Sequence, residues 1–336
     1  MTIVVLQFVF FAAVIVGAGS FLSRYADEIA EITGFGRLLI GSVLLASATS
    51  LPELSVDIAC IRQGNPDLAV GDLLGSSLMN LLILAVLDLT YHSRGKMFSR
   101  AASGHALGGA ASIALTAIVA IALLVERQTG GREWIGLGTG TILVMLAYVL
   151  SVRMIFLDQR IAARAAAEES VRTEKSGAAP TLVKSVALFV LAALVILLAG
   201  PRLSAAADEL AVRSGLAKTF VGTTLIALST SLPELVTCWA AVRLGSLDLA
   251  IGNIFGSNAF NMLILAGLDF AQPGSLLSVV SPLHCVTAIS AMLATSVTIM
   301  GQLYQVEHRR WLVEPDALVV ILIVLGSLGL VYTLSS

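Results

Sequence analysis

The residues best suited to chemistry in this chain occur twice. The segment Thr-Ser-Leu-Pro-Glu-Leu stands at 49–54 and again at 230–235, which places glutamates at Glu53 and Glu234. Both copies lie within long apolar stretches, where an ionisable side chain is costly and is by default a candidate for function. The alternative, a protonated carboxyl kept for packing, is weakened by the duplication.

Serine, glutamate and asparagine recur at helical spacing around each copy. Spacings of three and four residues place two side chains on one face of a helix. In each copy a serine lies three residues before the glutamate, and a second serine lies four residues before an asparagine. The predicted side-chain ligands are therefore Ser50, Glu53, Ser76, Asn80, Ser231, Glu234, Ser257 and Asn261. This all-oxygen set suits sodium or calcium and argues against zinc or copper. The structural alternative for the serines is that small residues let helices approach closely.

A proline precedes each glutamate. Pro52 lacks an amide donor and clashes with the carbonyl of Ala48, and Pro233 has the same relation to Ser229. Irregular backbone at membrane depth is tolerated where it lines a cavity or is buried in protein, and its free carbonyls are ligands for a hard cation. The sequence therefore predicts a broken helix at each motif.

The elements that must position these residues are membrane spans. The chain of 336 residues is 57% hydrophobic and 12% charged, with a mean hydropathy of +0.93, which places it in a bilayer. Its three cysteines have no CxxC spacing, so neither a disulfide framework nor a zinc site is expected. Hydropathy predicts ten spans, at 2–23, 37–60, 68–89, 104–124, 134–156, 182–200, 217–242, 247–269, 280–301 and 316–334.

The two motifs belong to a longer internal repeat with one constant offset, which equals the separation of Glu53 from Glu234. The matching core segments are 41–89 and 222–270. We expect a first five-helix unit at 1–156, a cytoplasmic linker at 157–181 and a second five-helix unit at 182–336. An odd number of helices makes the second unit inverted, and inverted repeats place a binding site at the bilayer midplane.

Basic residues predict the orientation. If the N-terminus is outside, fourteen Lys and Arg residues fall in inward loops and six in outward loops, so both termini are expected outside. The first apolar run has no basic region before it, and we expect it to be a retained helix rather than a signal peptide.

The motifs resemble those of the calcium:cation antiporter superfamily, and of the sodium/calcium exchangers in particular. The first repeat reads SATSLPEL and GSSLMN, and the second reads ALSTSLPEL and GSNAFN. The resemblance implies an all-α fold of ten transmembrane helices, with broken helices 2 and 7 and helices 3 and 8 around a central site. It implies the same eight side-chain ligands and adds backbone oxygens near Ala46, Thr49, Ala227 and Thr230.

The same resemblance implies function. We expect a secondary antiporter that exchanges sodium for calcium by alternating access, in the plasma membrane or the inner membrane of a prokaryote. It is expected to be no enzyme, to need no cofactor, to bind no nucleic acid, and to act without a protein partner, as a monomer. A calcium/proton exchanger using Glu53 and Glu234 is the main alternative; a cation channel and an intramembrane hydrolase are weaker ones.

Several positions depart from strict repetition or from the family pattern. Asp72 and Ser77 stand where the second repeat has Asn253 and Asn258, and both central positions are Asn where some exchangers have one Asp. The site is therefore expected to have one carboxylate fewer than in those relatives. For Asp57, we favour a helix-end charge that reaches water over a carboxylate on the access path.

Overall fold

The structure is a computed structural model that describes residues 2–90, 102–130, 133–134, 137–169, 181–214, 228–272, 274–304 and 315–335. Apart from one two-stranded hairpin, its regular elements are helical. The first repeat contains α1 (Thr2–Thr33), α2 (Arg37–Leu39), the π-helical turn η1 (Ile40–Leu45), α3 (Ala46–Thr49), α4 (Leu51–Arg62), α5 (Pro66–Thr90), α6 (Ala102–Thr129), β1 (Glu133–Trp134), β2 (Leu137–Gly138) and α7 (Thr139–Glu169).

The second repeat has matching long helices. They are α8 (Leu182–Ser214), α10 (Leu232–Arg243), α11 (Leu247–Leu268), the 3₁₀ turn η2 (Asp269–Ala271), α12 (Leu276–Val279), α13 (His284–Tyr304) and α14 (Pro315–Ser335). The connections between α4 and α5 and between α10 and α11 are alike, because the equivalent glycines Gly64 and Gly245 both adopt a left-handed backbone, with φ of +76° and +77°.

Eight of these helices are long and apolar enough to cross a membrane, and the bent pair 37–49 and 51–62 makes a ninth if it is one span. Within the described residues, eight of the ten predicted spans coincide with such a helix, and the predicted span 37–60 coincides with the bent pair. The remaining predicted span, 217–242, is described only from Leu228 onward, and its helix α10 begins at Leu232. The chain is an integral, multi-pass membrane protein.

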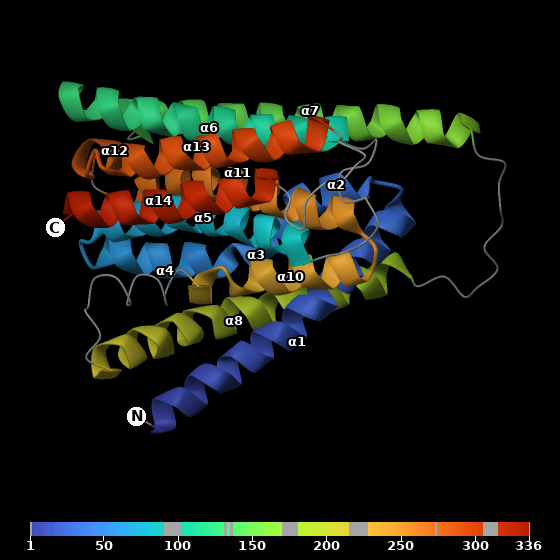
Figure 1. The fold of residues 1–336 in the computed structure, drawn as a ribbon, viewed down its shortest axis with the longest axis horizontal. Coiled ribbons are helices and arrows are strands. Elements are labelled where there is room, and N and C mark those ends of the chain that lie inside the picture. The colour runs from blue at the N-terminus through green and yellow to red at the C-terminus, as the bar shows by residue number, and fades with distance from the viewer. Residues whose placement is uncertain are drawn as a thin grey trace.

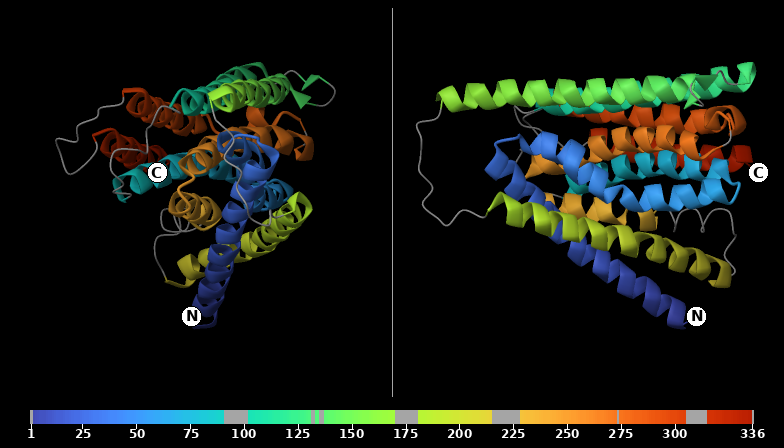
Figure 2. Two further views of the ribbon diagram at one scale, coloured as in Figure 1. Left: turned by 90° about the vertical axis from the view of Figure 1, so that its right-hand side faces the viewer. Right: turned by 180° about the vertical axis from the view of Figure 1, so that it is seen from behind.

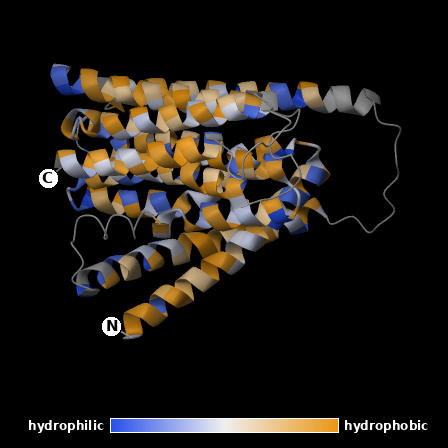
Figure 3. Cartoon of the chain, viewed as in Figure 1, coloured by the Kyte–Doolittle hydropathy of each residue, from blue (hydrophilic) through white to orange (hydrophobic). Residues whose placement is uncertain are grey.

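The helices lie roughly along one direction, and the two ends of the chain mark the same end of the bundle (Figures 1 and 2). Hydrophobic residues cover much of the outer surface of the helices, as lipid contact requires (Figure 3). The spans α5 and α11 are the most enclosed, with 72% and 89% of their most apolar stretches buried. These two helices therefore form the centre on which the outer spans pack.

Backbone contact is closest between the first broken helix and α11. A Cβ atom added to Gly256 would lie 2.3 Å from the carbonyl oxygen of Ser42, and one added to Gly252 would lie 2.6 Å from that of Leu38. Small residues let helices approach in this way. The segment α2–η1 of the first repeat therefore packs directly against α11, the central helix of the second repeat.

Two predicted boundaries differ from the structure. The span predicted at 134–156 begins only at Thr139, because Glu133–Trp134 and Leu137–Gly138 form the antiparallel strands β1 and β2. The predicted linker at 157–181 begins as helix, since α7 continues to Glu169. Alanine and arginine, which fill this extension, are strong helix formers.

Candidate functional site

Each motif interrupts its helix at the serine before the proline. Ser50 has φ −86° and ψ 8°, and Ser231 has φ −82° and ψ 2°, so both depart from helical geometry in the same way. Pro52 and Pro233 then occupy the first turn of α4 and α10, where a missing amide hydrogen does no harm. The first break bends the span by 43°. The predicted interruption is confirmed at both motifs.

All eight predicted side-chain ligands are buried, none being more than 2% exposed: Ser50, Glu53, Ser76, Asn80, Ser231, Glu234, Ser257 and Asn261. They come from the starts of α4 and α10 and from the middle of α5 and α11. Of the predicted backbone ligands, Ala46, Thr49 and Thr230 are also buried, whereas Ala227 lies outside the described residues.

Side chains of the two motifs meet around Glu234. Its Oε1 atom accepts hydrogen bonds of 3.4 Å from the hydroxyls of Ser50 and Ser257. The hydroxyls of Thr49 and Ser257 are also 3.4 Å apart. Ser50 and Thr49 belong to the first motif and Glu234 to the second, so the two copies adjoin across a sequence separation of 184 residues.

The central asparagines are oriented by their amide donors. The Nδ2 of Asn80 donates to Oδ1 of Asn258 at 3.0 Å, and the Nδ2 of Asn261 donates to the carbonyl of Leu73 at 3.3 Å. Asn258 in turn donates to the carbonyl of Ser77 at 3.2 Å. If either side-chain amide were flipped, its Oδ1 atom would face another acceptor oxygen. The Oδ1 atoms of Asn80 and Asn261 therefore point away from Asn258 Oδ1 and from the carbonyl of Leu73, respectively.

Six of the eight predicted side chains each hold a buried oxygen without a hydrogen-bond partner among the described residues. These atoms are Glu53 Oε2, Ser76 Oγ, Asn80 Oδ1, Ser231 Oγ, Glu234 Oε2 and Asn261 Oδ1. A buried oxygen without a partner is destabilising by about 1 to 3 kcal/mol, so such a concentration needs an explanation. A hard cation offers it, because calcium takes six to eight oxygen ligands.

One predicted backbone ligand already accepts hydrogen bonds, unlike the unpartnered side-chain oxygens. The carbonyl of Ala46, a predicted ligand, accepts hydrogen bonds from the amide of Ser50 at 3.0 Å and from the hydroxyl of Thr49 at 3.2 Å. Among the described residues, no three His, Cys, Asp or Glu side chains gather around one point. A cation between Glu53 and Glu234 would therefore rest mainly on neutral oxygens.

The favoured prediction for Asp57 is wrong. Its side chain does not reach water: the residue is 0% exposed, and neither carboxylate oxygen has a partner among the described residues. Oδ2 of Asp72 is a third buried carboxylate oxygen of this kind. Helical spacing showed that Asp57 lies one turn beyond Glu53, but not that α5 would cover it. The first repeat thus places two carboxylates one helical turn from Glu53 and Ser76.

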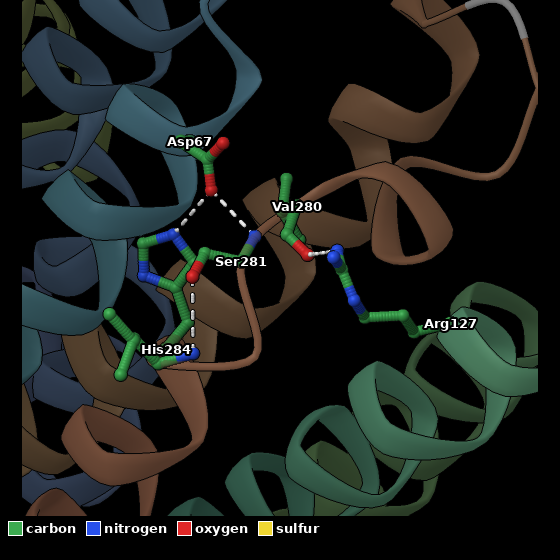
Figure 4. A network of polar contacts seen from close by, with 6 residues as sticks. Asp67, Arg127, Val280, Ser281 and His284 are labelled. Carbon is green, nitrogen blue, oxygen red and sulfur yellow. Dashed lines mark hydrogen bonds and ion pairs between the residues drawn. The ribbon is translucent and has the colours of Figure 1, made fainter.

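Two further acids, in the first turns of α5 and α11, contact histidines. Asp67 opens α5, and its Oδ1 lies 3.0 Å from Nε2 of His284 and 2.7 Å from the amide of Ser281 (Figure 4). Asp248 opens α11, and its Oδ1 lies 2.9 Å from Nε2 of His105. The two acids occupy equivalent positions in the two repeats, so the repeat extends to these contacts at the helix ends. Neither pairing follows from spacing along the sequence.

Beside Asp67, Arg127 of α6 donates to the carbonyl of Val280 at 2.9 Å (Figure 4). On α1, Asp27 accepts hydrogen bonds of 2.5 Å from Arg37 and from Ser246. Glu28 accepts one of 3.0 Å from Ser185. These acids connect helices at the ends of the bundle and are not among the residues that meet between the motifs.

Comparison with known proteins agrees with this architecture. The sequence pattern of the family described as sodium/calcium exchanger protein matches residues 3–157 and 184–333. The chain is 31% identical over 282 residues to the inner membrane protein YrbG of Escherichia coli, covering 81% of this chain and 80% of that one. It is 29% identical over 253 residues to the putative antiporter CaxA of Alkalimonas amylolytica, covering 72% of each.

The fold also matches a solved structure, the sodium-calcium exchanger NCX_Mj soaked with Na⁺ and Sr²⁺. The TM-score is 0.68 with 16% sequence identity, and the match covers 98% of both chains. The class defined by these findings is a multi-pass helical transporter of the calcium:cation antiporter superfamily. Within it, this chain belongs to the sodium/calcium exchanger family.

Proposed function

We propose that this protein exchanges sodium for calcium across its membrane and that both ions use the cluster between the two motifs. The observation that carries the proposal is the set of six buried oxygens without partners, which come from both repeats and include one from each glutamate. Two carboxylates balance the charge of one calcium ion, and neutral oxygens can hold sodium with the same glutamates in turn.

Alternating access follows from the repeat. The two broken helices have the same local geometry at Ser50 and Ser231, and α4 and α10 lie toward opposite ends of the bundle (Figure 1). This supports the prediction of two inverted five-helix units, 1–156 and 182–336. Inverted units that rock about a midplane site expose it to each side of the membrane in turn. The excess of basic residues in the predicted inward loops supports termini that face outward.

The second candidate function is calcium/proton exchange, which the buried carboxyl groups support. Asp57 lies with its side chain enclosed one turn from Glu53, and intramembrane carboxyl groups serve as proton relays in transporters. Such groups could exchange protons for calcium without any sodium.

The driving ion separates these two functions. Proteoliposomes loaded with sodium and diluted into sodium-free buffer at equal pH impose only a sodium gradient, and a matched set imposes only a pH gradient. We expect calcium uptake with the sodium gradient and none above background with the pH gradient. The reverse result would replace sodium/calcium exchange by calcium/proton exchange, and uptake with neither gradient imposed would indicate a channel.

A further inference from the structure

The first repeat contains a pair of acids that the second repeat lacks. Asp57 on α4 and Asp72 on α5 fall on Cys238 and Asn253 when the two repeats are aligned by their motifs. Asp57 is 0% exposed with both carboxylate oxygens unpartnered, and Oδ2 of Asp72 is buried and unpartnered as well. Three buried carboxylate oxygens therefore lie in this part of the structure without a donor.

The equivalent residues of the second repeat show that these two positions face each other. Asn253 on α11 donates from Nδ2 to the sulfur of Cys238 on α10 at 3.4 Å, and to the hydroxyl of Thr237 at 3.1 Å. Asp57 and Asp72 occupy the same places on α4 and α5, and their carboxylates interact electrostatically. The neutral pair is hydrogen-bonded, whereas the acid pair has no hydrogen to share when both groups are ionised.

The acid pair lies to one side of the predicted site. Asp57 is four residues beyond Glu53, and Asp72 is four residues before Ser76, so both are displaced by one helical turn, about 6 Å, toward the turn at Gln63–Asn65. In the second repeat the same displacement leads to the neutral Cys238 and Asn253. The surroundings of the site are therefore acidic on one side and neutral on the other.

Asp57 is buried and Asp72 is partly buried, and two such neighbouring carboxylates repel each other and lose hydration, so they require a compensating positive charge. Neither Asp57 oxygen has a partner of any kind among the described residues, so no lysine or arginine there supplies that charge. A divalent hard cation balances a pair of carboxylates and prefers oxygen ligands. The hydroxyl of Thr230, which hydrogen-bonds to the Asp72 side chain, adds a neutral oxygen at the same place.

We propose that Asp57 and Asp72 form a second cation site, one helical turn from the site between the motifs, that binds a divalent ion passing between that site and one face of the membrane. The inference rests on the proposed function only in taking calcium as the transported divalent ion. It predicts a protein that handles calcium differently at its two faces, because the second repeat has no matching acids.

Counting bound calcium tests this site without relying on transport. The purified full-length protein with Glu53→Gln and Glu234→Gln is titrated with radioactive calcium and compared with the same protein that also carries Asp57→Asn and Asp72→Asn. We expect one calcium ion fewer per chain after the second pair of substitutions. Cys238→Ser in the Glu53→Gln, Glu234→Gln background is the matched control, since it alters the equivalent position of the other repeat without changing charge, and it should leave the count unchanged.

Binding of equal amounts of calcium with and without Asp57 and Asp72 would overturn the second site. Unchanged thermal stability on Asp57→Asn and Asp72→Asn with no change in bound calcium would likewise overturn it, and would indicate that protons already neutralise the pair, because Asn resembles a protonated Asp. If the fourfold variant does not fold, Asp72→Asn alone is examined in proteoliposomes of uniform orientation. The half-saturating calcium concentration should then rise several-fold from one face only, and an equal change from both faces would contradict the proposal.

These results are separable from the proposed function. Wild-type protein that shows no sodium-driven calcium uptake but loses one bound calcium ion with Asp57→Asn and Asp72→Asn would refute the exchange and retain the site. Normal uptake with an unchanged calcium count would do the opposite.

Discussion

The hydroxyl of Ser50 lies 3.4 Å from Oε1 of Glu234, although the two residues are 184 positions apart. Ser50 interrupts the helix of the first motif and Glu234 opens the helix after the second break. The contact shows that the two motifs adjoin in the folded chain. They meet, and each contributes oxygens to one buried cluster.

Removing the Ser50 hydroxyl should therefore weaken ion binding at a glutamate of the other repeat. We expect Ser50→Ala to raise the half-saturating calcium concentration several-fold, because Glu234 loses a donor that orients it. Ser55→Ala is the control, since Ser55 lies on α4, and the hydrogen bonds of the described residues include none between its side chain and either glutamate. Initial rates of calcium uptake over a range of calcium concentrations measure the effect, and equal changes in both variants would contradict it.

Asn258 should be important for stability as well as for transport. It joins the side chain of Asn80 to the carbonyl of Ser77, and both contacts are buried. Asn258→Ala leaves the buried amide of Asn80 without its acceptor and removes a contact to the carbonyl of Ser77, which should destabilise the protein by about 1 to 3 kcal/mol. Thermal unfolding of the purified protein should show a lower midpoint than for Gln128→Ala, a substitution on the exposed end of α6. Similar midpoints for the two variants would argue against the bridge.

Glycine is required at Gly256 by the closeness of another backbone. A methyl group there would lie 2.3 Å from the carbonyl oxygen of Ser42, and neither backbone can move without displacing its helix. Gly256→Ala should destabilise the protein by about 1 to 3 kcal/mol and reduce transport. Gly326→Ala on α14, where nothing lies within 4 Å of the added atom, should be neutral in the same assays. A tolerated Gly256→Ala would mean that this contact is looser than the structure shows.

The two histidine–aspartate pairs should differ in their effect on stability because they differ in burial. The His105 side chain is 3% exposed and that of His284 is 15% exposed. The Asp67 side chain that binds His284 is 56% exposed, so that pair should contribute about 0.2 to 1 kcal/mol at most. His105→Ala should lower the unfolding midpoint more than His284→Ala, since it also removes packing. The opposite order would show that the ends of α5 and α13 depend more on their polar network than burial suggests.

The repeat predicted much of this structure because residues at equivalent positions of the two copies adopt the same local backbone geometry. The breaks at Ser50 and Ser231 and the burial of both glutamates follow from motif and spacing alone. Spacing, however, gives only the face of a helix and not the neighbour that covers it. For that reason the burial of Asp57, the bridge through Asn258 and the pairing of Asp248 with His105 emerged only when α5, α11 and α6 were placed in space.

The most direct test of the central claim is calcium uptake into sodium-loaded proteoliposomes by the wild-type protein and by Glu53→Gln and Glu234→Gln separately. If the glutamates share one site, each substitution alone should abolish sodium-driven uptake while the variant remains folded and reconstituted in normal amount. Uptake that persists at about half the wild-type rate in either single variant would show that the two motifs act independently, and would contradict the single shared site.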